Sequence, residues 1–206
     1  VEGKPAHASR PQDGVNAFEA MAAMSTGLDR YKRGLASLQR RYRDLNGTER
    51  NPTLNVGGVF AGGAGDKINT VPAKAIFSLD RRLVPGEQIA VVEKELRTTL
   101  ASLADDQKPA SCTIGAPLRI EPCTVDVKHP LCQSFAGAVR SIRRRTAGFR
   151  ITAGFTDLHY FVVDGGLPGI GYGVKGENAH GNDERVRIRD VALTARTYAE
   201  FMLRGI

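Results

Sequence analysis

Apolar positions in the first part of the chain recur at a spacing typical of a long amphipathic helix. Two interleaved sets repeat every seven residues: Met21, Leu28, Leu35 and Tyr42, and Met24, Tyr31, Leu38 and Leu45. Together they form one continuous apolar stripe, for which Asp13 is the expected N-cap. Gly27 and Gly34 interrupt good helix formers, so we expect a bend or a break near one of them. Strand-like segments flank the stripe, which favours packing on a sheet over a coiled coil.

Strand-like segments and a second helical pattern fill the remainder of the first 120 residues. The expected elements are a scrap of strand within residues 1–9, strands over 53–61 and 70–84, a helix over 89–103 and a strand over 111–120. A Gly-rich turn at residues 62–66 predicts a hairpin with a functional tip. The order strand, helix, strand, strand, helix, strand is that of a ferredoxin-like fold. Its four-stranded antiparallel sheet carries both helices on one face.

From Cys123 onward the pattern changes to alternating helix and strand. The expected elements are a helix opened by His129-Pro130 and running to Arg145, a strand over 149–153, a short helix over 157–163, a strand over 169–174 and a helix over 191–203. This alternation indicates a three-layer α/β domain, but two strands are too few for a stable parallel sheet. The sequence therefore predicts an α+β protein, with one domain over residues 1–120 and a partial α/β domain over residues 123–206.

The charge of the chain raises the hypothesis of nucleic-acid binding, and the distribution of that charge disfavours it. The formal net charge is +7 over 206 residues, and basic surfaces attract nucleic acid by releasing counterions. However, the basic runs at 40–43 and 143–145 lie within amphipathic helical patterns, and no aromatic ladder accompanies them. We interpret them as solvated helix faces that favour small anionic substrates, and we expect no nucleic-acid partner.

Other features of composition indicate a cytoplasmic protein. No run of about 18 apolar residues exists, so we expect no membrane span, and no secretory leader is recognisable. The three cysteines, Cys112, Cys123 and Cys132, are odd in number and lack C-x-x-C spacing. We expect them to be reduced thiols in the cytosol.

Two histidines stand in constrained loops where an imidazole could act chemically. His7 follows a Gly/Pro loop at the start of the chain, and His180 lies between small residues near its end. A neutral imidazole held as His180 is held is a common metal ligand. The alternative for His180 is a capped turn, in which Asn182 or Asp183 opens the helix that follows.

Three polar residues could bind a substrate. Asn69 could donate to a carbonyl or carboxylate, and the guanidinium of Arg82 suits a substrate carboxylate. Thr156, at a strand-to-helix junction, could bind an anionic group. The alternatives are a turn-capping Asn69, a surface Arg82 paired with Asp80, and an N-capping role for Thr156.

Six different short motifs follow one another along nearly the whole chain. They are Gly-x-x-Ala-His-Ala-Ser at 3–9, Gly14-Val15-Asn16-Ala17, Asn69-x-Val71-Pro72, Asp80-x-Arg82-x-x-Pro85-Gly86-Glu87, Thr156-Asp157 and Ala179-His180-x-x-Asp183-Glu184. This ordered set resembles the M20 family of metallopeptidases and deacylases, which includes carboxypeptidase G2, aminoacylase, acetylornithine deacetylase and succinyl-diaminopimelate desuccinylase. The resemblance implies that residues 1–120 are the lid, which also forms a homodimer, and that residues 123–206 are the C-terminal part of the catalytic domain.

The resemblance also implies a role for each candidate residue. His180 resembles the last metal ligand, and His7 resembles the lid histidine that stabilises the oxyanion in the partner subunit's site. Asn69 and Arg82 resemble the lid residues that grip the amide and the carboxylate of the substrate. Thr156 resembles the hydroxyl of the catalytic domain that contacts substrate.

The implied activity is hydrolysis of an amide or peptide bond in N-acyl amino acids or small peptides. In this family a hydroxide held by two metal ions attacks the carbonyl, and a glutamate takes and returns the proton. The metal is usually zinc, with cobalt or manganese as other candidates.

The residues that would complete the metal site are absent from this sequence. The family's His-x-Asp motif, its bridging aspartate and its Glu-Glu pair all belong to the stretch before the lid, and neither His129 nor His159 replaces them. We therefore expect an incomplete fragment that is inactive alone, with His180 metal-free or weakly occupied. The alternative is a non-catalytic binding or dimerisation module of M20 ancestry.

Overall fold

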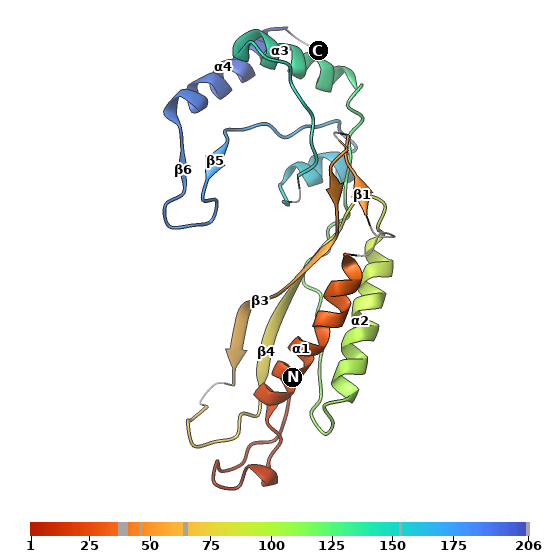
Figure 1. Cartoon of the computed structure of the whole chain (residues 1–206), viewed down its shortest axis with the longest axis vertical. Coiled ribbons are helices and arrows are strands. Elements are labelled where there is room, and N and C mark those ends of the chain that lie inside the picture. The colour runs from red at the N-terminus through yellow and green to blue at the C-terminus, as the bar shows by residue number, and fades with distance from the viewer. Residues whose placement is uncertain (37–40, 46, 64–65, 153, 205–206) are drawn as a thin grey trace. The chain divides into compact units, whose positions relative to one another are not determined.

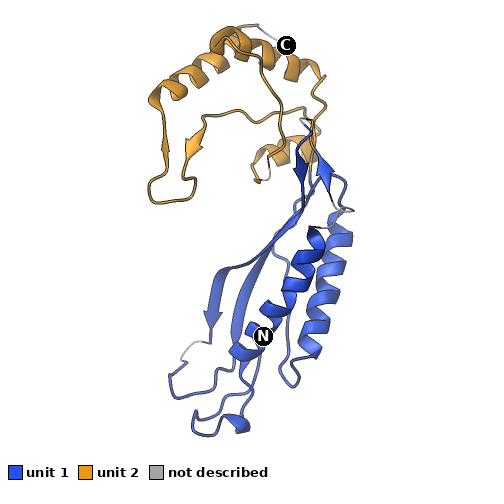
Figure 2. Ribbon diagram, viewed as in Figure 1, with its two compact units in different colours: residues 1–43, 47–122 blue, residues 44–46, 123–206 orange. Residues whose placement is uncertain are grey.

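The computed structural model describes residues 1–36, 41–45, 47–63, 66–152 and 154–204. The chain forms two compact units: unit 1 comprises Val1–Arg43 and Gly47–Pro122, and unit 2 comprises Asp44–Asn46 and Cys123–Ile206 (Figure 2). The main division lies close to the domain boundary expected from the sequence. The assignment of unit 1 as a lid, and of unit 2 as part of a catalytic domain, stays a prediction.

Unit 1 contains two long helices and a long antiparallel hairpin (Figure 1). Its elements are the 3-10 helix Pro11–Asp13, α1 at Ala17–Leu35, β1 at Tyr42–Arg43, β2 at Glu49–Arg50, β3 at Thr53–Gly62, β4 at Ala75–Arg82 and α2 at Ile89–Asp105. β1 pairs with β2, and β3 pairs with β4 with a register shift between Val56 and Phe60. The predicted hairpin and the predicted second helix are confirmed. Residues 64 and 65, at the tip of the hairpin, lie outside the described residues.

The start and the end of α1 differ from the sequence prediction. Its N-cap is Asn16, whose side chain accepts hydrogen bonds from the backbone N–H groups of Phe18 and Glu19, whereas Asp13 ends the preceding 3-10 helix. The helix runs through Gly27 without a break and ends at Leu35, directly after the second glycine.

The predicted continuation of the α1 stripe is wrong beyond its end. Tyr42 belongs to β1. Arg41, just before this strand, and Arg43, within it, both pair with the Glu49 carboxylate of β2, at 2.6 Å and 3.1 Å. Leu45 lies outside any helix, and Leu38 lies outside the described residues. The apolar spacing alone did not reveal that local cross-strand pairing would replace the helix.

Replacing Asn16 with alanine should destabilise unit 1 by about 1 kcal/mol, the usual cost of losing an N-cap side chain. The Asn16 Oδ1 atom accepts from Phe18 N at 3.0 Å and from Glu19 N at 3.2 Å, so both donors would lose their protein partner. Urea denaturation measures the effect. Asn51→Ala, at an exposed position between strands, is the matched control and should leave the unfolding midpoint unchanged.

The core of unit 1 lies between the two helices and one face of the hairpin. Met24 and Leu28 of α1 and Leu100 of α2 are almost completely buried. Alternate residues of the strands pack against them: Leu54, Val56, Phe77 and Leu79. The prediction that both helices cover the same face of the sheet is therefore confirmed for β3 and β4.

The four-stranded sheet expected from the sequence is not confirmed. In the described part of unit 1, only β3 and β4 form a long ladder, and Glu2 makes isolated bridges to Lys74 and to Ser111. Residues 112–126, after Ser111, form no strand. Gly115 weakens a strand and Pro117 cannot donate to a ladder, which gives a physical reason for the difference.

Ion pairs rather than a strand ladder attach residues 112–120 to α2. Glu93 accepts from Arg97 at 2.8 Å and from two nitrogens of Arg119 at 2.5 Å and 2.9 Å. Arg97 also donates to the carbonyl oxygen of Ile114 at 3.0 Å. The hydrogen bonds from Arg119, and then those from Arg97, lower the pKa of Glu93 from 4.5 to about 2.

This lowered pKa predicts how the Glu93 cluster responds to pH. Because the folded-state pKa lies below the unfolded value, the stabilisation is present above pH 4.5 and is lost as the pH falls towards about 2. Glu93→Gln should therefore be less stable than wild type at pH 6, and the difference should shrink across this window. Denaturation midpoints from pH 6 to pH 2 measure it; a constant difference would contradict the assignment.

Unit 2 is built on two packed helices and a short hairpin. Its elements are α3 at Pro130–Arg143, the π-helix Tyr160–Asp164, β5 at Gly176–Glu177, β6 at Arg185–Val186 and α4 at Ile188–Arg204. α3 begins after His129, whose Nδ1 accepts from the Leu131 N–H at 3.2 Å. The ring of Phe135 packs against those of Tyr172, Tyr198 and Phe201, which joins the two helices.

The helices predicted for unit 2 are confirmed, and its predicted strands are not. Residues 149–152 and 169–174 form no strand, and residue 153 lies outside the described part. Gly169, Gly171 and Gly173 disfavour a strand, and no neighbouring strand of unit 2 pairs with either segment. The three-layer α/β arrangement is therefore absent from the described residues of unit 2.

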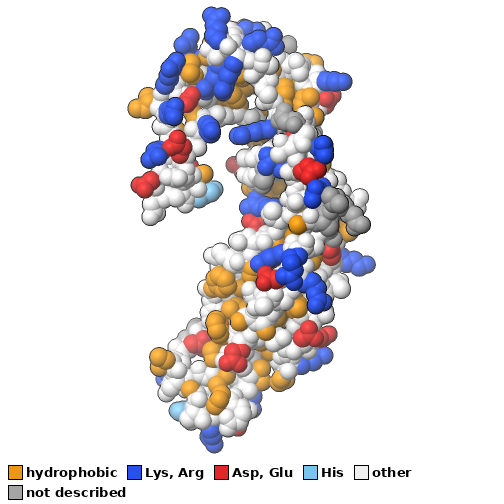
Figure 3. All heavy atoms as spheres, viewed as in Figure 1, with side chains coloured by type: hydrophobic (Ala, Val, Ile, Leu, Met, Phe, Trp, Pro, Cys, Tyr) orange, Lys and Arg blue, Asp and Glu red, His pale blue; other side chains and the backbone are white. Residues whose placement is uncertain are grey.

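Basic side chains lie on the surface of the two helices of unit 2. Figure 3 shows Lys and Arg side chains gathered over α3 and α4. Within the described ranges, no helix has the length and apolar character needed to cross a membrane.

Candidate functional site

The structure brings two of the predicted site residues together in unit 1. His7 forms an isolated antiparallel bridge with Thr70, and the N–H of Ala8 donates to the carbonyl oxygen of Asn69 at 2.9 Å. A further bond joins Val71 N to the carbonyl oxygen of Ala6 at 2.8 Å. These backbone bonds hold the His7 loop and the Asn69 loop side by side, although the two loops are far apart in sequence.

The surroundings of the His7 ring determine which nitrogen carries its proton. The Nδ1 atom lies 3.1 Å from the backbone nitrogen of Ser9 and 2.8 Å from the Ser9 hydroxyl oxygen. A backbone N–H can only donate, so Nδ1 must accept, and the proton of the neutral ring is on Nε2. The exposed imidazole therefore presents an N–H donor to whatever approaches it. This is the form needed to stabilise a negatively charged oxygen.

Arg82 lies at the far end of β4 from these loops. It pairs with Asp80, with Arg82 Nη2 2.7 Å and Nε 3.1 Å from Asp80 Oδ2, and both side chains are about half exposed. Ala75, at the other end of β4, is seven residues away, or about 23 Å along a strand. The structure thus shows the surface pair with Asp80, and a substrate role for Arg82 stays a prediction.

The neighbouring Arg81 has a structural role that sequence reasoning missed. Its side chain is 5 % exposed and bonds Glu87 at 2.5 Å and the hydroxyl of Tyr31 at 3.3 Å. Burial opposes its charge, but the bonds to Glu87 and Tyr31 outweigh this effect and raise the pKa of Arg81. Glu87 also accepts from the Val84 N–H at 3.0 Å, and Gly86 takes the positive φ that this turn requires. The Asp80-to-Glu87 motif thus fixes the end of β4.

Thr156 lies in unit 2 at the start of a short helical segment. Its carbonyl oxygen accepts from the His159 N–H at 3.1 Å, and Thr156 itself is exposed. The ring of His159 packs near those of Phe155 and Tyr160, with centroids 6.2 Å and 5.5 Å away. Thr156 therefore takes part in this turn through its backbone carbonyl, and both an N-capping role for its side chain and its contact with substrate stay predictions.

His180 lies on the connection between β5 and β6 of unit 2. Its φ of 65° and that of Asn178, 56°, are left-handed, and Gly181 N donates to the Asn178 carbonyl at 2.8 Å. The His180 N–H lies 3.4 Å from Glu184 Oε2, and the residue is exposed. Because α4 starts only at Ile188, after β6, the alternative of a turn that opens this helix is wrong. The imidazole projects from a hairpin end.

The described residues do not by themselves form a metal centre. No group of three or more His, Cys, Asp or Glu side chains in the described ranges could hold a metal ion. His129 caps α3 and His159 packs among aromatic rings, as described above, so neither supplements His180. The described residues therefore do not make a complete metal site, and a ligand role for His180 stays a prediction.

Comparisons with known proteins place the chain in a family. The family model for the peptidase dimerisation domain of M20 proteins matches residues 1–108 of the 206. No curated protein sequence matches.

Several solved structures share the fold of the chain. A tripeptidase from Staphylococcus aureus subsp. aureus Mu50 is 23% identical with a TM-score of 0.69, over 97% of this chain and 48% of its own. An M20 family metallo-carboxypeptidase from Sulfolobus solfataricus is 19% identical with a TM-score of 0.67, over 97% and 55%. AtUAH, solved in complex with (S)-hydroxyglycine, is 15% identical with a TM-score of 0.71, over 98% and 44%. The chain thus spans about half the length of these proteins, and its match to the dimerisation-domain model shows that it belongs to the M20 peptidase family.

Proposed function

We propose that this chain is part of a metal-dependent hydrolase that cleaves an amide or peptide bond in N-acyl amino acids or small peptides. The observation that carries the proposal is the match of residues 1–108 to the peptidase dimerisation domain. Two of the structures with the same fold are those of a tripeptidase and a metallo-carboxypeptidase. Because the chain spans about half of their length, the rest of the metal site would come from another stretch of the full-length protein, which we place in the cytoplasm.

In this proposal unit 1 is a ferredoxin-like lid that forms a homodimer. The bridges of Glu2 to both Lys74 and Ser111 support it, because they give the N-terminal segment the central position that this fold requires. Residues 1–120 would be the lid and residues 123–206 the C-terminal part of the catalytic domain.

His7 would donate from Nε2 to the oxyanion that forms when the substrate carbonyl is attacked in the partner subunit's site. The Ser9 contacts to Nδ1 support this role because they leave Nε2 as the donor. Asn69, on the adjoining loop, would bind the substrate amide. A donor already in place before the reaction stabilises the transition state without having to reorganise.

His180 would be the last ligand of a two-metal site, with zinc as the proposed metal and cobalt or manganese as other candidates. Such ions, when bound, acidify a water molecule and polarise the substrate carbonyl. Arg82 and Thr156 would contact the carboxylate and another polar group of the substrate, which requires Arg82 to exchange its exposed partner Asp80 for the substrate.

The test is hydrolysis by the full-length protein. Release of amino acid from a panel of N-acyl amino acids, dipeptides and tripeptides is measured after removal of metal and again with zinc, cobalt or manganese. We expect metal-dependent activity on at least one substrate and none from residues 1–206 alone. Inactivity across the panel with all three metals would contradict the proposal.

The second candidate is a non-catalytic binding or dimerisation module of M20 ancestry. It is supported by the adjacency of the His7 and Asn69 loops, which would hold its ligand. The gene sequence that precedes Val1 distinguishes the hydrolase from the non-catalytic module, because only the hydrolase needs the His-x-Asp and Glu-Glu motifs there.

A further inference from the structure

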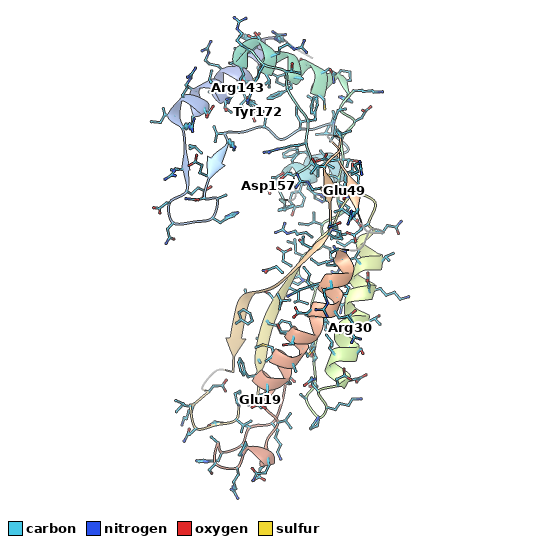
Figure 4. All side chains as sticks on the ribbon, viewed as in Figure 1. Glu19, Arg30, Glu49, Arg143, Asp157 and Tyr172 are labelled. Carbon is cyan, nitrogen blue, oxygen red and sulfur yellow. The ribbon has the colours of Figure 1, made fainter. Side chains whose placement is uncertain are left out.

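One arginine joins the two ends of the segment that carries His180. Arg143, the last residue of α3, points to Tyr172 in Figure 4. Its guanidinium makes four hydrogen bonds: to Tyr172 Oη at 2.8 Å, to Asp190 Oδ1 at 2.7 Å, to the Asp190 carbonyl at 3.3 Å and to Thr194 Oγ1 at 2.9 Å. Tyr172 precedes the β5–β6 hairpin, and Asp190 and Thr194 follow it in α4. Both ends of residues 173–187 are therefore held by one side chain.

The environment of Arg143 makes this junction stiff. Its side chain is 11 % exposed and that of Asp190 is 30 % exposed. Burial opposes the charge of Arg143, but the hydrogen bonds to Asp190 and Tyr172 outweigh it and raise its pKa. A planar guanidinium that bonds several groups at once fixes their geometry as well as their separation.

Tyr172 is held independently on its other sides. Its carbonyl oxygen accepts from the hydroxyl of Tyr198 at 2.6 Å, and its ring lies 5.1 Å from that of Phe135. The end of the segment that leaves towards β5 is therefore attached to both α3 and α4.

The hairpin itself has little internal support. β5 and β6 pair over only two residues each, and their ion pair, Arg185 with Glu177 at 2.9 Å, is more than half exposed. A two-stranded hairpin is marginal alone, and exposed ion pairs stabilise weakly. Within unit 2, the contacts that hold this segment most firmly are therefore those at its two ends.

We propose that Arg143 is a positioning residue that fixes both ends of residues 173–187 and thereby sets where the His180 imidazole lies. The anchoring follows from contacts within unit 2. Its consequence for metal binding rests on the function proposed above for His180.

Hydrogen exchange in the metal-free full-length protein tests the anchoring. In Arg143→Met, amides of residues 176–186 should exchange about tenfold faster than in wild type, the effect of losing a hydrogen bond to a charged group. Arg143→Lys should restore part of the protection. Arg97→Met, which removes a similar arginine from unit 1, is the control and should leave these amides unchanged.

If circular dichroism shows that Arg143→Met has lost its helices, a second variant, Tyr172→Phe, tests the anchoring instead. It removes only the Oη contact, so the helices should persist while residues 173–187 exchange faster. Unchanged exchange in this segment with intact helices would overturn the anchoring.

Metal titration of the full-length protein tests the consequence. Arg143→Met should weaken metal binding about tenfold, the lower end of the range for residues that orient a ligand, and Arg143→Lys should weaken it less. If His180→Ala loses metal and Arg143→Met does not, the positioning role is wrong. If His180→Ala also keeps its metal, the ligand assignment of the proposed function fails, and exchange alone decides the anchoring.

Discussion

Replacing His180 with alanine should abolish metal-dependent hydrolysis by the full-length protein, with a fall in kcat/KM of at least about a thousandfold. The imidazole lies at an exposed hairpin end, so its loss should leave the fold intact. The metal content should fall from about two ions per subunit to about one, because a site that loses a ligand holds its ion weakly. Elemental analysis after dialysis and the rate on the best substrate measure the two effects.

A matched control separates this effect from the general loss of a histidine. His129→Asn keeps an N-cap acceptor for α3, and His129 lies in no proposed site. It should retain both the metal and the activity. A His180→Ala protein with full metal content and full activity would contradict the ligand assignment.

Replacing His7 with alanine should lower kcat about a hundredfold to a thousandfold, with little change in KM or in metal content. The reason is that a donor aimed at the oxyanion acts mainly in the transition state, and losing one such donor costs about 3 kcal/mol. Steady-state kinetics at saturating metal measure the split between kcat and KM.

Two further variants show whether the Nε2 donor is responsible. His7→Gln can still present a side-chain N–H and should recover part of kcat, whereas His7→Phe should not. Arg10→Ala, in the same loop, removes only an exposed ion pair with Asp13 and should behave as wild type. Equal activity of the Ala, Gln and Phe variants would contradict the donor role.

The helices of this chain were largely predictable, because their signals are local. The apolar spacing from Met21 to Leu35 and from Ile89 onward gave α1 and α2, and His129-Pro130 marked the start of α3. The end of α1 was not predictable from spacing, since the pairing of Tyr42–Arg43 with Glu49–Arg50 replaced the helix that the stripe would have continued.

The strands were predicted less well, because a strand exists only with its partners. β3 and β4 follow each other in sequence, joined by residues 63–74, and their pairing was predicted, although β4 begins at Ala75 and not at residue 70. Residues 111–120, 149–153 and 169–174 have strand-like composition, but apart from the bridge of Ser111 to Glu2 their described parts pair with no strand. Sequence pattern can show that a segment suits a sheet, and cannot show that a neighbouring strand is present.

The candidate site was predictable in its residue types and less so in its geometry. The adjacency of His7 and Asn69 depends on bonds between loops far apart in sequence, so their motifs alone could not reveal it. The choice of Nε2 as donor depends on the orientation of the Ser9 N–H. In β4, the Asp80-to-Glu87 motif pointed to Arg82 as the functional residue. The buried ion pair is instead that of Arg81 with Glu87, because side chains alternate along a strand and that of Arg82 faces solvent.

The most direct measurement of the central claim mixes two inactive variants of the full-length protein. If His7 of one subunit serves the site that contains His180 of the other, a heterodimer of His7→Ala and His180→Ala has one intact site. With random exchange of subunits in a symmetric dimer, the mixture should recover about a quarter of wild-type activity. A double variant mixed with either single variant should recover none. Absence of recovery, in a mixture shown by mass spectrometry to contain heterodimers, would contradict a site shared between subunits.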